Sequence, residues 1–334
     1  MESSKIDALG AFQSLVREEL ETLEKRLGDT LRSDVPIIGE ICTGINDVSG
    51  KRVRPTVLFL AARSLGTAEE DIVTAGLAVE LIHTATLIHD DIIDDHSFRR
   101  GKPTIYSTWG HNVATIMGDF LYSKAFAILG EARLYEIMTI LSNVTHVMSV
   151  GEMMQLQHRK NINVSEDGYI DIIQMKTASL FSASCECGAS FSGGGNGHRA
   201  SYSAFGENIG LAFQITDDLF DYLAADEAIG KPTASDFADG RVTLPFITAF
   251  RNAPENARKR VQDIFREGFE SGSDWNDVVL FVQDYGGIEY SLEKARGYRE
   301  RAKGHLVEIS PSPERDALHL AADYVVDRIV PYSG

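Results

Sequence analysis

HDDIIDD at residues 89–95 and QITDDLFD at residues 214–221 share the pattern D-D-x-x-D. Both acidic runs interrupt apolar sequence, LIHTATLIH in the first case and IGLAFQI in the second. A single acidic run is more often a solvated helix face, but these flanks are typical of a helix that lines a cavity. Residues four apart on a helix share a face, so Asp90 projects with Asp94, and Asp217 with Asp221. Such carboxylates favour Mg²⁺ over zinc, and two pairs facing each other could hold a polyphosphate through bridging metals.

The sequence around the two motifs is helical throughout. Apolar residues recur at three- and four-residue spacing over residues 9–27, and no alternating strand pattern competes with this spacing. Thr67 and Glu70 match a capping box, and Pro254 and Pro313 stand near the first turn of two later helices. The same spacing predicts helices over residues 68–95, 112–130, 134–158, 168–191, 201–225, 255–270, 275–285, 287–308 and 313–330. We therefore expect an all-α fold.

The breaks between these segments are short, and none is long enough to be a flexible interdomain linker. We expect a single domain over residues 1–334. Helices as long as 68–95 and 134–158 would span much of its diameter and leave a central cavity as the natural ligand site.

The composition narrows the class of protein. The chain has 334 residues, 49 acidic and 32 basic side chains, a net charge of −17 and 43% hydrophobic residues. An acidic surface repels nucleic acid and anionic membranes, so a phosphate-bearing ligand needs local cations or metal ions. No uninterrupted apolar run approaches the ~20 residues of a membrane span. Three unevenly spaced cysteines and the absence of a secretory start favour the cytoplasm.

Two basic runs supply such local cations. GKRVRP at residues 50–55 places three cations in four positions, and RRGKP at residues 99–103 directly follows the first acidic motif. Arginine suits bidentate phosphate contacts, whereas lysine offers a mobile point charge. For Arg52 and Lys102, an ordinary solvated turn is as good an explanation as a binding role.

Together these motifs resemble the trans-isoprenyl diphosphate synthases, also called polyprenyl synthetases. The resemblance runs from residue 50 to residue 245 in the order of that family. Its landmarks are GKRVRP at 50–55, His83, HDDIIDD with RRGKP at 89–103, GEMMQL at 151–156, Lys176 with Thr177, FQITDDLFD at 213–221 and GKPTASDFADGRVTLP at 230–245.

The resemblance implies an all-α isoprenoid synthase-type bundle of long antiparallel helices around a deep cavity, usually as a homodimer. Its members join isopentenyl diphosphate to an allylic diphosphate head to tail and release diphosphate, with more than one Mg²⁺ ion. It assigns Mg²⁺ binding to Asp90, Asp94, Asp217 and Asp221. It assigns isopentenyl diphosphate binding to Lys51, Arg54, His83 and Arg100, and allylic diphosphate binding to Arg99, Lys176, Thr177, Gln214, Lys231 and Arg241. At Arg241 the family usually has lysine, so this ligand is less secure than Lys231.

This chemistry accounts for the residue types. Ionisation of an allylic C–O bond leaves a carbocation and a diphosphate, so fixed cations and Mg²⁺ lower the barrier by neutralising the departing group. The carbocation must meet isopentenyl diphosphate before it meets water, which requires a dry apolar chamber. Thr177 and Gln214 could place neutral oxygen dipoles near this carbocation. We expect the departing diphosphate to remove the final proton.

Product length should depend on how far the chain grows beside the first acidic helix. Ala85 and Thr86 lie about one turn before Asp90, and both are small. The first motif also lacks the two-residue insertion of many bacterial short-chain enzymes. We therefore expect a product longer than C20, with geranylgeranyl (C20) or farnesyl (C15) diphosphate as alternatives. Ordinary helix packing would explain the small residues equally well.

Other classes explain less of the sequence. An HD-type metal phosphohydrolase, suggested by His83 and His89-Asp90, leaves the second D-D-x-x-D without a role. A terpene cyclase would have no second diphosphate for the basic runs. A non-catalytic subunit of a heteromeric prenyltransferase would be expected to lose one acidic motif, and both are intact. Cys185 and Cys187 lack partners for a metal site and fit core packing. We expect no nucleic-acid partner and at most transient membrane contact for product release.

Overall fold

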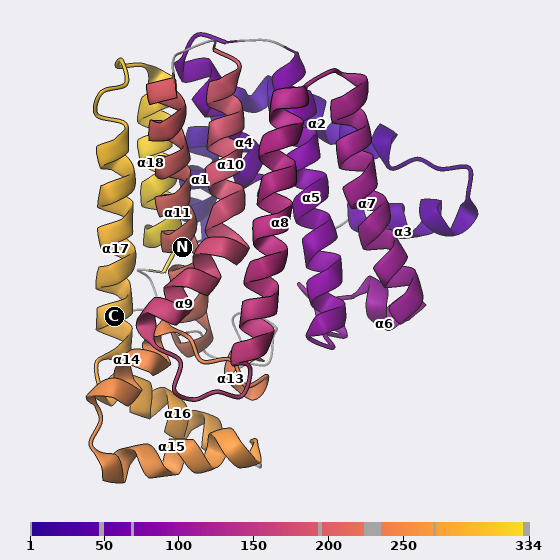
Figure 1. The fold of residues 1–334 in the computed structure, drawn as a ribbon. Coiled ribbons are helices and arrows are strands. Elements are labelled where there is room, and N and C mark those ends of the chain that lie inside the picture. Colours follow the sequence, from indigo (N-terminus) through magenta and orange to yellow (C-terminus); the bar gives the residue numbers. More distant parts are fainter. Residues whose placement is uncertain are drawn as a thin grey trace. The chain divides into compact units, whose positions relative to one another are not determined.

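The computed structural model describes residues 2–46, 50–67, 70–192, 196–223, 235–269 and 272–329 (Figure 1). Helices make up nearly all of this part of the chain. The first half contains α1 (Glu2–Gln13), the short helix η1 (Ser14–Val16), α2 (Arg17–Thr30), α3 (Pro36–Asn46), α4 (Val53–Ser64), α5 (Asp71–Ile93), β1 (Phe98–Arg99), β2 (Lys102–Pro103), α6 (Ile105–Trp109), α7 (His111–Glu131) and α8 (Tyr135–His158). The second half contains α9 (Glu166–Ile173), the π-helical segment η2 (Gln174–Ala178), α10 (Ser179–Ser190), α11 (Asn196–Leu223), α13 (Ser235–Ala238), α14 (Leu244–Asn252), α15 (Glu255–Glu267), α16 (Gly272–Asp284), α17 (Gly287–His305) and α18 (Pro313–Asp327).

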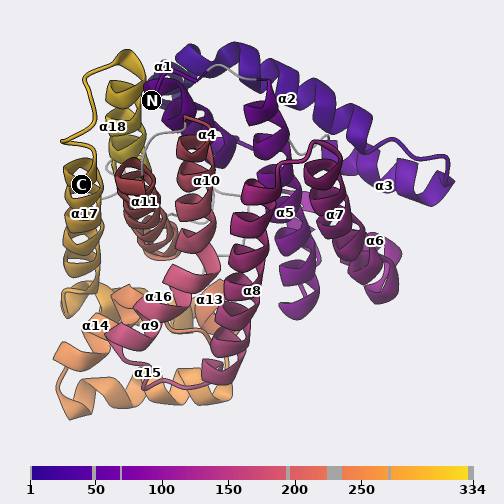
Figure 2. The same ribbon diagram turned by 45° about the horizontal axis from the view of Figure 1, so that its top comes forward.

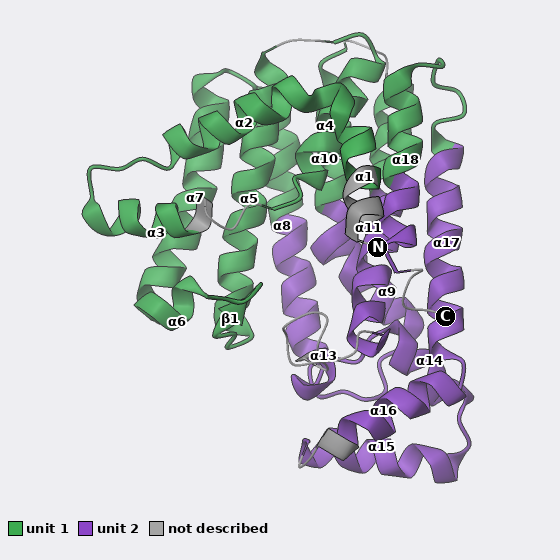
Figure 3. Ribbon diagram, turned by 180° about the vertical axis from the view of Figure 1, so that it is seen from behind, with its two compact units in different colours: residues 1–145, 180–206, 305–321 green, residues 146–179, 207–304, 322–334 purple. Residues whose placement is uncertain are grey.

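The chain divides into two compact units, coloured separately in Figure 3. Unit 1 comprises residues 1–145, 180–206 and 305–321, and unit 2 comprises residues 146–179, 207–304 and 322–334. The first acidic motif lies in unit 1 and the second in unit 2. The single domain over residues 1–334, and the facing of the two motifs across one cavity, stay predictions.

Unit 1 is built around α5, which carries the first acidic motif at its end. α5 packs against α7, α4 and α2, and Figures 1 and 2 both draw α5 and α7 side by side. Most side chains of α4 and of the first half of α5 are buried. Each fully buried Leu, Ile, Val or Phe contributes about 1.5–3 kcal/mol, so this apolar core holds the end of α5 in place.

Unit 2 positions the segment of residues 165–178. Ser165 caps α9, its hydroxyl accepting from the backbone N–H of Gly168 at 3.1 Å. Glu166 then accepts hydrogen bonds from Tyr290, Lys294 and Arg251, at 2.7–3.0 Å. These bonds hold the start of α9 against α14 and α17. At its other end α9 continues directly into the π-helical segment η2.

The all-α prediction is confirmed, and most of the expected helices recur within a few residues of their ends. Two differ: η1 divides the segment 9–27 between α1 and α2, and η2 divides the segment 168–191 between α9 and α10. The capping box is wrong: Glu70 precedes α5 without a capping bond, and its carboxylate pairs with Arg26 instead. The periodicity also gave no sign of α3, α14 or the β1–β2 hairpin, because short elements carry too few apolar repeats. Cys42, Cys185 and Cys187 are free and buried, as core packing predicts.

Two described helices, α5 and α7, are long and apolar enough to cross a membrane. The apolar window of α5 is 72% buried within the protein, whereas that of α7 is 33% buried. By length and composition alone, the core helix of a globular protein passes the same test. The prediction that the chain has no membrane span therefore stays a prediction.

Candidate active site

The first acidic motif lies at the carboxyl end of α5. The helix ends at Ile93, and the backbone N–H of Asp94 donates to the carbonyl of Asp90 at 2.9 Å. Both carboxylate residues are half-buried. The carboxyl end of a helix carries partial negative charge, so carboxylates there are unfavourable unless a cation is close. Asp90 and Asp94 therefore form a natural place for a divalent cation.

Asp91, which lies between Asp90 and Asp94 in the sequence, forms an ion pair within the protein. It is 6% exposed, and its Oδ1 accepts from Nε and Nη2 of Arg99, both at 2.8 Å. This pair fastens the β1–β2 hairpin to α5. Arg99, predicted for the allylic site, is thus held by Asp91 in this structure.

Arg100 and Gly101 form the two-residue turn of this hairpin. Phe98 pairs with Pro103 and Arg99 with Lys102, and both turn residues have positive φ, 51° and 75°. Positive φ at both positions is the backbone of a type I′ turn, which matches the twist of a hairpin. The left-handed conformation costs a non-glycine residue such as Arg100 about 1–2 kcal/mol. Residues held in strain of this kind cluster at functional sites.

The structure brings three of the four predicted isopentenyl diphosphate ligands together in unit 1. Nη1 of Arg54 lies 3.2 Å from Nε2 of His83, and its guanidinium stacks 4.3 Å from the Phe181 ring centre. Nη1 of Arg100 lies 3.9 Å from where a Cβ on Gly50 would stand. Burial, followed by the charges of Arg54 and Arg100, holds the pKa of His83 well below its usual value. His83 is therefore a neutral hydrogen-bonding group among cations.

The fourth ligand, Lys51, is exposed in the segment that precedes α4. Its carbonyl oxygen accepts a hydrogen bond from Nε2 of Gln13 at 2.8 Å. Arg52 differs from Arg54, because its guanidinium pairs with Glu24 and with the buried Glu80. Arg52 therefore fixes the segment before α4. Its side chain is only 10% exposed, so the solvated turn offered as an explanation for this residue is wrong. The sequence analysis missed Glu80, whose only signal was one carboxylate inside an otherwise apolar segment.

The second acidic motif, on α11 in unit 2, places its three carboxylates in different environments. Oδ1 of Asp217 lies 2.9 Å from Nη2 of Arg328, which stacks on the Phe213 ring at 4.1 Å. Asp218 is 5% exposed, whereas Asp221 is half-buried. Asp217 and Asp221 share a helix face as predicted, but Arg328 was not foreseen. It directly follows α18, which ends at Asp327, and nothing local in the sequence couples it to Asp217.

Asp218 is the centre of a hydrogen-bond chain. Its Oδ2 accepts from the Tyr169 hydroxyl at 2.5 Å, and its Oδ1 accepts from Nε2 of Gln214 at 2.8 Å. The Oε1 of Gln214 in turn accepts from the Thr177 hydroxyl at 2.8 Å. Burial, followed by the charge of Asp236, raises the pKa of Asp218, and these hydrogen bonds oppose that rise. The structure thus joins Thr177 and Gln214, two predicted catalytic residues.

Lys176 and Thr177 lie in the π-helical segment. Nζ of Lys176 is 2.5 Å from Oε2 of Glu152 on α8. A Cβ added to Gly151 would lie 2.7 Å from Cβ of Met175 and 2.9 Å from the backbone nitrogen of Lys176. Glycine at this position is thus what allows α8 to approach the segment. Single π-helical turns occur frequently at functional sites.

The remaining predicted residues have varied surroundings. Arg241 is 14% exposed at its side chain and pairs with Asp236 at 2.8 Å and Asp239 at 2.9 Å. Lys231 lies outside the described residues. On α5, Ala85 is fully buried, whereas Thr86 is half-buried and its hydroxyl donates to the carbonyl of His83 at 2.7 Å.

The donor sets fit Mg²⁺ better than a transition metal. Among the described residues, no group of three or more His, Cys, Asp and Glu is arranged to hold a metal by itself. Mg²⁺ is commonly bound by one or two carboxylates together with substrate phosphates and water. Asp90 and Asp94 can supply the carboxylates. The two histidines of the phosphohydrolase alternative are engaged elsewhere. His83 adjoins Arg54, and Nε2 of His89 lies 3.2 Å from the carbonyl oxygen of Thr115.

Comparison with known proteins shows the family of this chain. The family model described as polyprenyl synthetase matches residues 35–281. Octaprenyl diphosphate synthase of Haemophilus influenzae is 32% identical over 332 residues, which cover 98% of this chain and 99% of that protein. Geranylgeranyl diphosphate synthase of Methanosarcina mazei is 34% identical over 287 residues, 84% and 87% of the two chains. A polyprenyl synthase from Caulobacter crescentus, crystallised with calcium and isoprenyl diphosphate, gives a TM-score of 0.92 at 32% identity and covers 96% of this chain and 98% of that one. The chain therefore belongs to the polyprenyl synthetase family and is a prenyltransferase with the all-α fold of that family.

Proposed function

We propose that this prenyltransferase condenses isopentenyl diphosphate head to tail with an allylic diphosphate, releases diphosphate and makes a product longer than C20. The observation that carries the proposal is the chemistry at the end of α5. Two half-buried carboxylates, Asp90 and Asp94, stand at a helix carboxyl end, and Arg100 follows them in a strained hairpin turn. A metal-bound diphosphate fits this arrangement. The metal carries positive charge for the two carboxylates, and the diphosphate carries negative charge for Arg100.

The isopentenyl diphosphate site is proposed to comprise Lys51, Arg54, His83 and Arg100. Arg54 is held in place by the Phe181 ring, so its guanidinium is presented in a fixed geometry. The neutral imidazole of His83 donates one hydrogen bond without adding a charge that burial would penalise. Arginines of this kind bind phosphate oxygens bidentately.

The allylic site is proposed to use Arg99, Lys176, Thr177, Gln214, Lys231 and Arg241. When bound, Mg²⁺ neutralises the diphosphate as it departs. Lys176 adds a fixed positive charge for the same group, positioned by Glu152. Thr177 and Gln214 contribute neutral oxygen dipoles beside the carbocation, and neither is a strong nucleophile. Asp91, Asp236 and Asp239 must release Arg99 and Arg241 for these two arginines to bind phosphate.

Product length is a proposal because the relatives differ in name, from octaprenyl to geranylgeranyl diphosphate synthase. Thr86 stands ~40° around the helix from Asp90, whereas Ala85 stands ~140° away. Thr86 is also half-buried, and Ala85 is fully buried. We therefore place Thr86 beside the growing chain and keep Ala85 as a second chain-length residue.

The activity assay supplies purified protein with farnesyl diphosphate, isopentenyl diphosphate and Mg²⁺, and the products are resolved by length. We expect products longer than C20 and no turnover when EDTA removes the metal. Asp90→Asn should abolish turnover. Asp284→Asn, which neutralises a carboxylate at the end of α16, should not. Products that stop at C20 would contradict the long-chain proposal.

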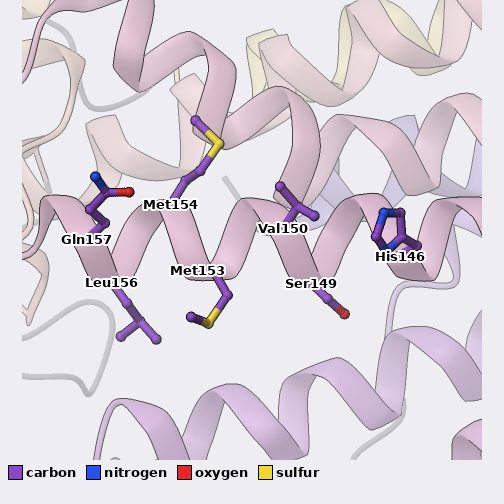
Figure 4. A pocket seen from close by; sticks show the side chains of 7 residues that line it. All are labelled: His146, Ser149, Val150, Met153, Met154, Leu156 and Gln157. Carbon is purple, nitrogen blue, oxygen red and sulfur yellow. The ribbon is translucent and has the colours of Figure 1, made fainter.

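We also propose a homodimer, formed through an apolar face of α8 in unit 2. Val150 and Met153 on α8 are 39% and 67% exposed. An open groove of about 650 Å³ runs along α8. In Figure 4, Met153 and Leu156 point to one side of the helix and Met154 to the other. Exposed apolar surface of this kind commonly marks a protein interface.

Sedimentation velocity tests the dimer. Met153→Glu should shift the protein to monomer, because a carboxylate would be buried in the interface. Val307→Glu alters a similarly exposed apolar residue, 72% exposed, in the turn that follows α17, and should leave a dimer. A monomeric wild type would contradict the proposal. The cytoplasm remains the proposed location, with transient membrane contact for product release.

A further inference from the structure

The hydrogen-bond chain around Asp218 specifies one orientation of the Gln214 amide. The amino end of this side chain donates to Asp218, and its oxygen accepts from the Thr177 hydroxyl. If the amide were flipped, its oxygen would face a carboxylate and its amino group would face a hydroxyl. The chain therefore selects one of two nearly isosteric states.

Tyr169 fixes the other side of this chain. Its hydroxyl donates to Oδ2 of Asp218 at 2.5 Å, and the Tyr169 side chain is 4% exposed. With one donor on each oxygen, the Asp218 carboxylate cannot turn without losing a bond. Tyr169 lies on α9, Thr177 on the π-helical segment and Gln214 on α11. The hydrogen bonds around Asp218 therefore connect three elements.

Packing alone does not call for this arrangement. A buried carboxylate is costly unless its hydrogen bonds are satisfied, and apolar residues of similar volume are often as stable. A buried carboxylate at position 218 is explained if the orientation of the Gln214 amide, which it fixes, serves the reaction.

We propose that Tyr169 and Asp218 are positioning residues that hold the Gln214 amide, and through it the Thr177 hydroxyl, in the geometry required for carbocation formation. The inference rests on the proposed roles of Thr177 and Gln214. Because those dipoles act on charge that develops only in the transition state, their misplacement lowers kcat more than it raises KM for the allylic diphosphate.

Tyr169→Phe is the first test. Removing the hydroxyl should lower kcat about tenfold, the rate equivalent of one lost hydrogen bond to a charged group, with KM for isopentenyl diphosphate within about twofold of wild type. Tyr202→Phe is the matched control, because Tyr202 is fully buried and its hydroxyl bonds Ser64 in unit 1. The control should lose stability without losing kcat. Equal kcat values for the two variants would overturn the inference.

Asp218→Asn sharpens the test. The amide keeps the shape of the carboxylate, but its amino group must face one of the two donors, Tyr169 or Gln214. Combining it with Tyr169→Phe removes one donor and lets the Asn oxygen face Gln214 again. The double variant should therefore have at least the kcat of Asp218→Asn alone. A double variant whose losses multiply would overturn the inference.

These outcomes are separable from failure of the proposed function. An inactive wild-type enzyme would contradict the function itself. Unfolding by urea gives a second readout that needs no turnover. The double-mutant cycle between Tyr169 and Asp218 should show a non-additive free energy of unfolding, as contacting residues do. Additive values would show that the two side chains do not act as a unit.

Discussion

Replacing Gly151 with alanine tests how closely α8 must approach the π-helical segment. The added Cβ would lie 2.7 Å from Cβ of Met175 and 2.9 Å from the backbone nitrogen of Lys176, where ordinary contacts are 3.4–4 Å. The segment must therefore move by roughly 1 Å, since the obstructing atoms belong to or adjoin the backbone. Lys176 and Thr177 would move with it.

We expect Gly151→Ala to lose much of its activity and little of its stability. A displacement of about 1 Å in catalytic groups lowers the rate on the order of 100-fold. Overpacking costs about 1–3 kcal/mol, and the higher helix propensity of alanine returns about 1 kcal/mol, so the free energy of unfolding should fall by only about 0–2 kcal/mol. Gly151→Ala should thus be a folded enzyme with a strongly reduced kcat.

Two measurements check this, the incorporation of labelled isopentenyl diphosphate and unfolding in urea. Gly297→Ala is the matched control, because Gly297 lies in α17 with nothing within 4 Å of the added Cβ. It should gain about 1 kcal/mol and keep the wild-type kcat. If Gly151→Ala behaves like this control, the close approach of α8 has no part in positioning Lys176 and Thr177.

Three further predictions concern the ends of the site. Arg328→Met should lower the free energy of unfolding by about 2 kcal/mol, less than for a fully buried pair because the Asp217 side chain is 46% exposed; a loss below about 0.5 kcal/mol in urea unfolding would contradict the importance of this pair. Thr86→Phe should shorten the product, whereas Thr84→Phe, on the same helix but rotated by about 200°, should not; equal product lengths from both would contradict the assignment. His83 has a lowered pKa, so below its usual value of about 6.5 the unfolded chain binds a proton that the folded protein excludes, and stability falls as the pH drops. His83→Gln should therefore flatten the decrease in Tm between pH 7 and pH 5, and an unchanged slope would contradict this account.

Much of the protein follows from local sequence. The spacing of apolar residues predicted the all-α class, and the two acidic motifs with their basic neighbours predicted the chemistry of the site. Asp90 shares a helix face with Asp94, and Asp217 with Asp221, because helix geometry alone relates residues four apart. Such relations need no knowledge of how helices pack.

The contacts of each charged residue, in contrast, depend on how the helices pack. The tertiary structure assigns Asp91 to Arg99, Asp217 to Arg328 and Asp218 to Tyr169, although the carboxylates are chemically alike. Two of these partners come from distant helices, and their approach depends on packing that no local pattern encodes. The π-helical segment likewise packs closely against Gly151 on another helix, a contact that no pattern within the segment indicates. Burial distinguishes the roles of these carboxylates. A buried carboxylate such as Asp218 needs hydrogen-bond donors from the protein, whereas a half-exposed one such as Asp90 can still bind a cation.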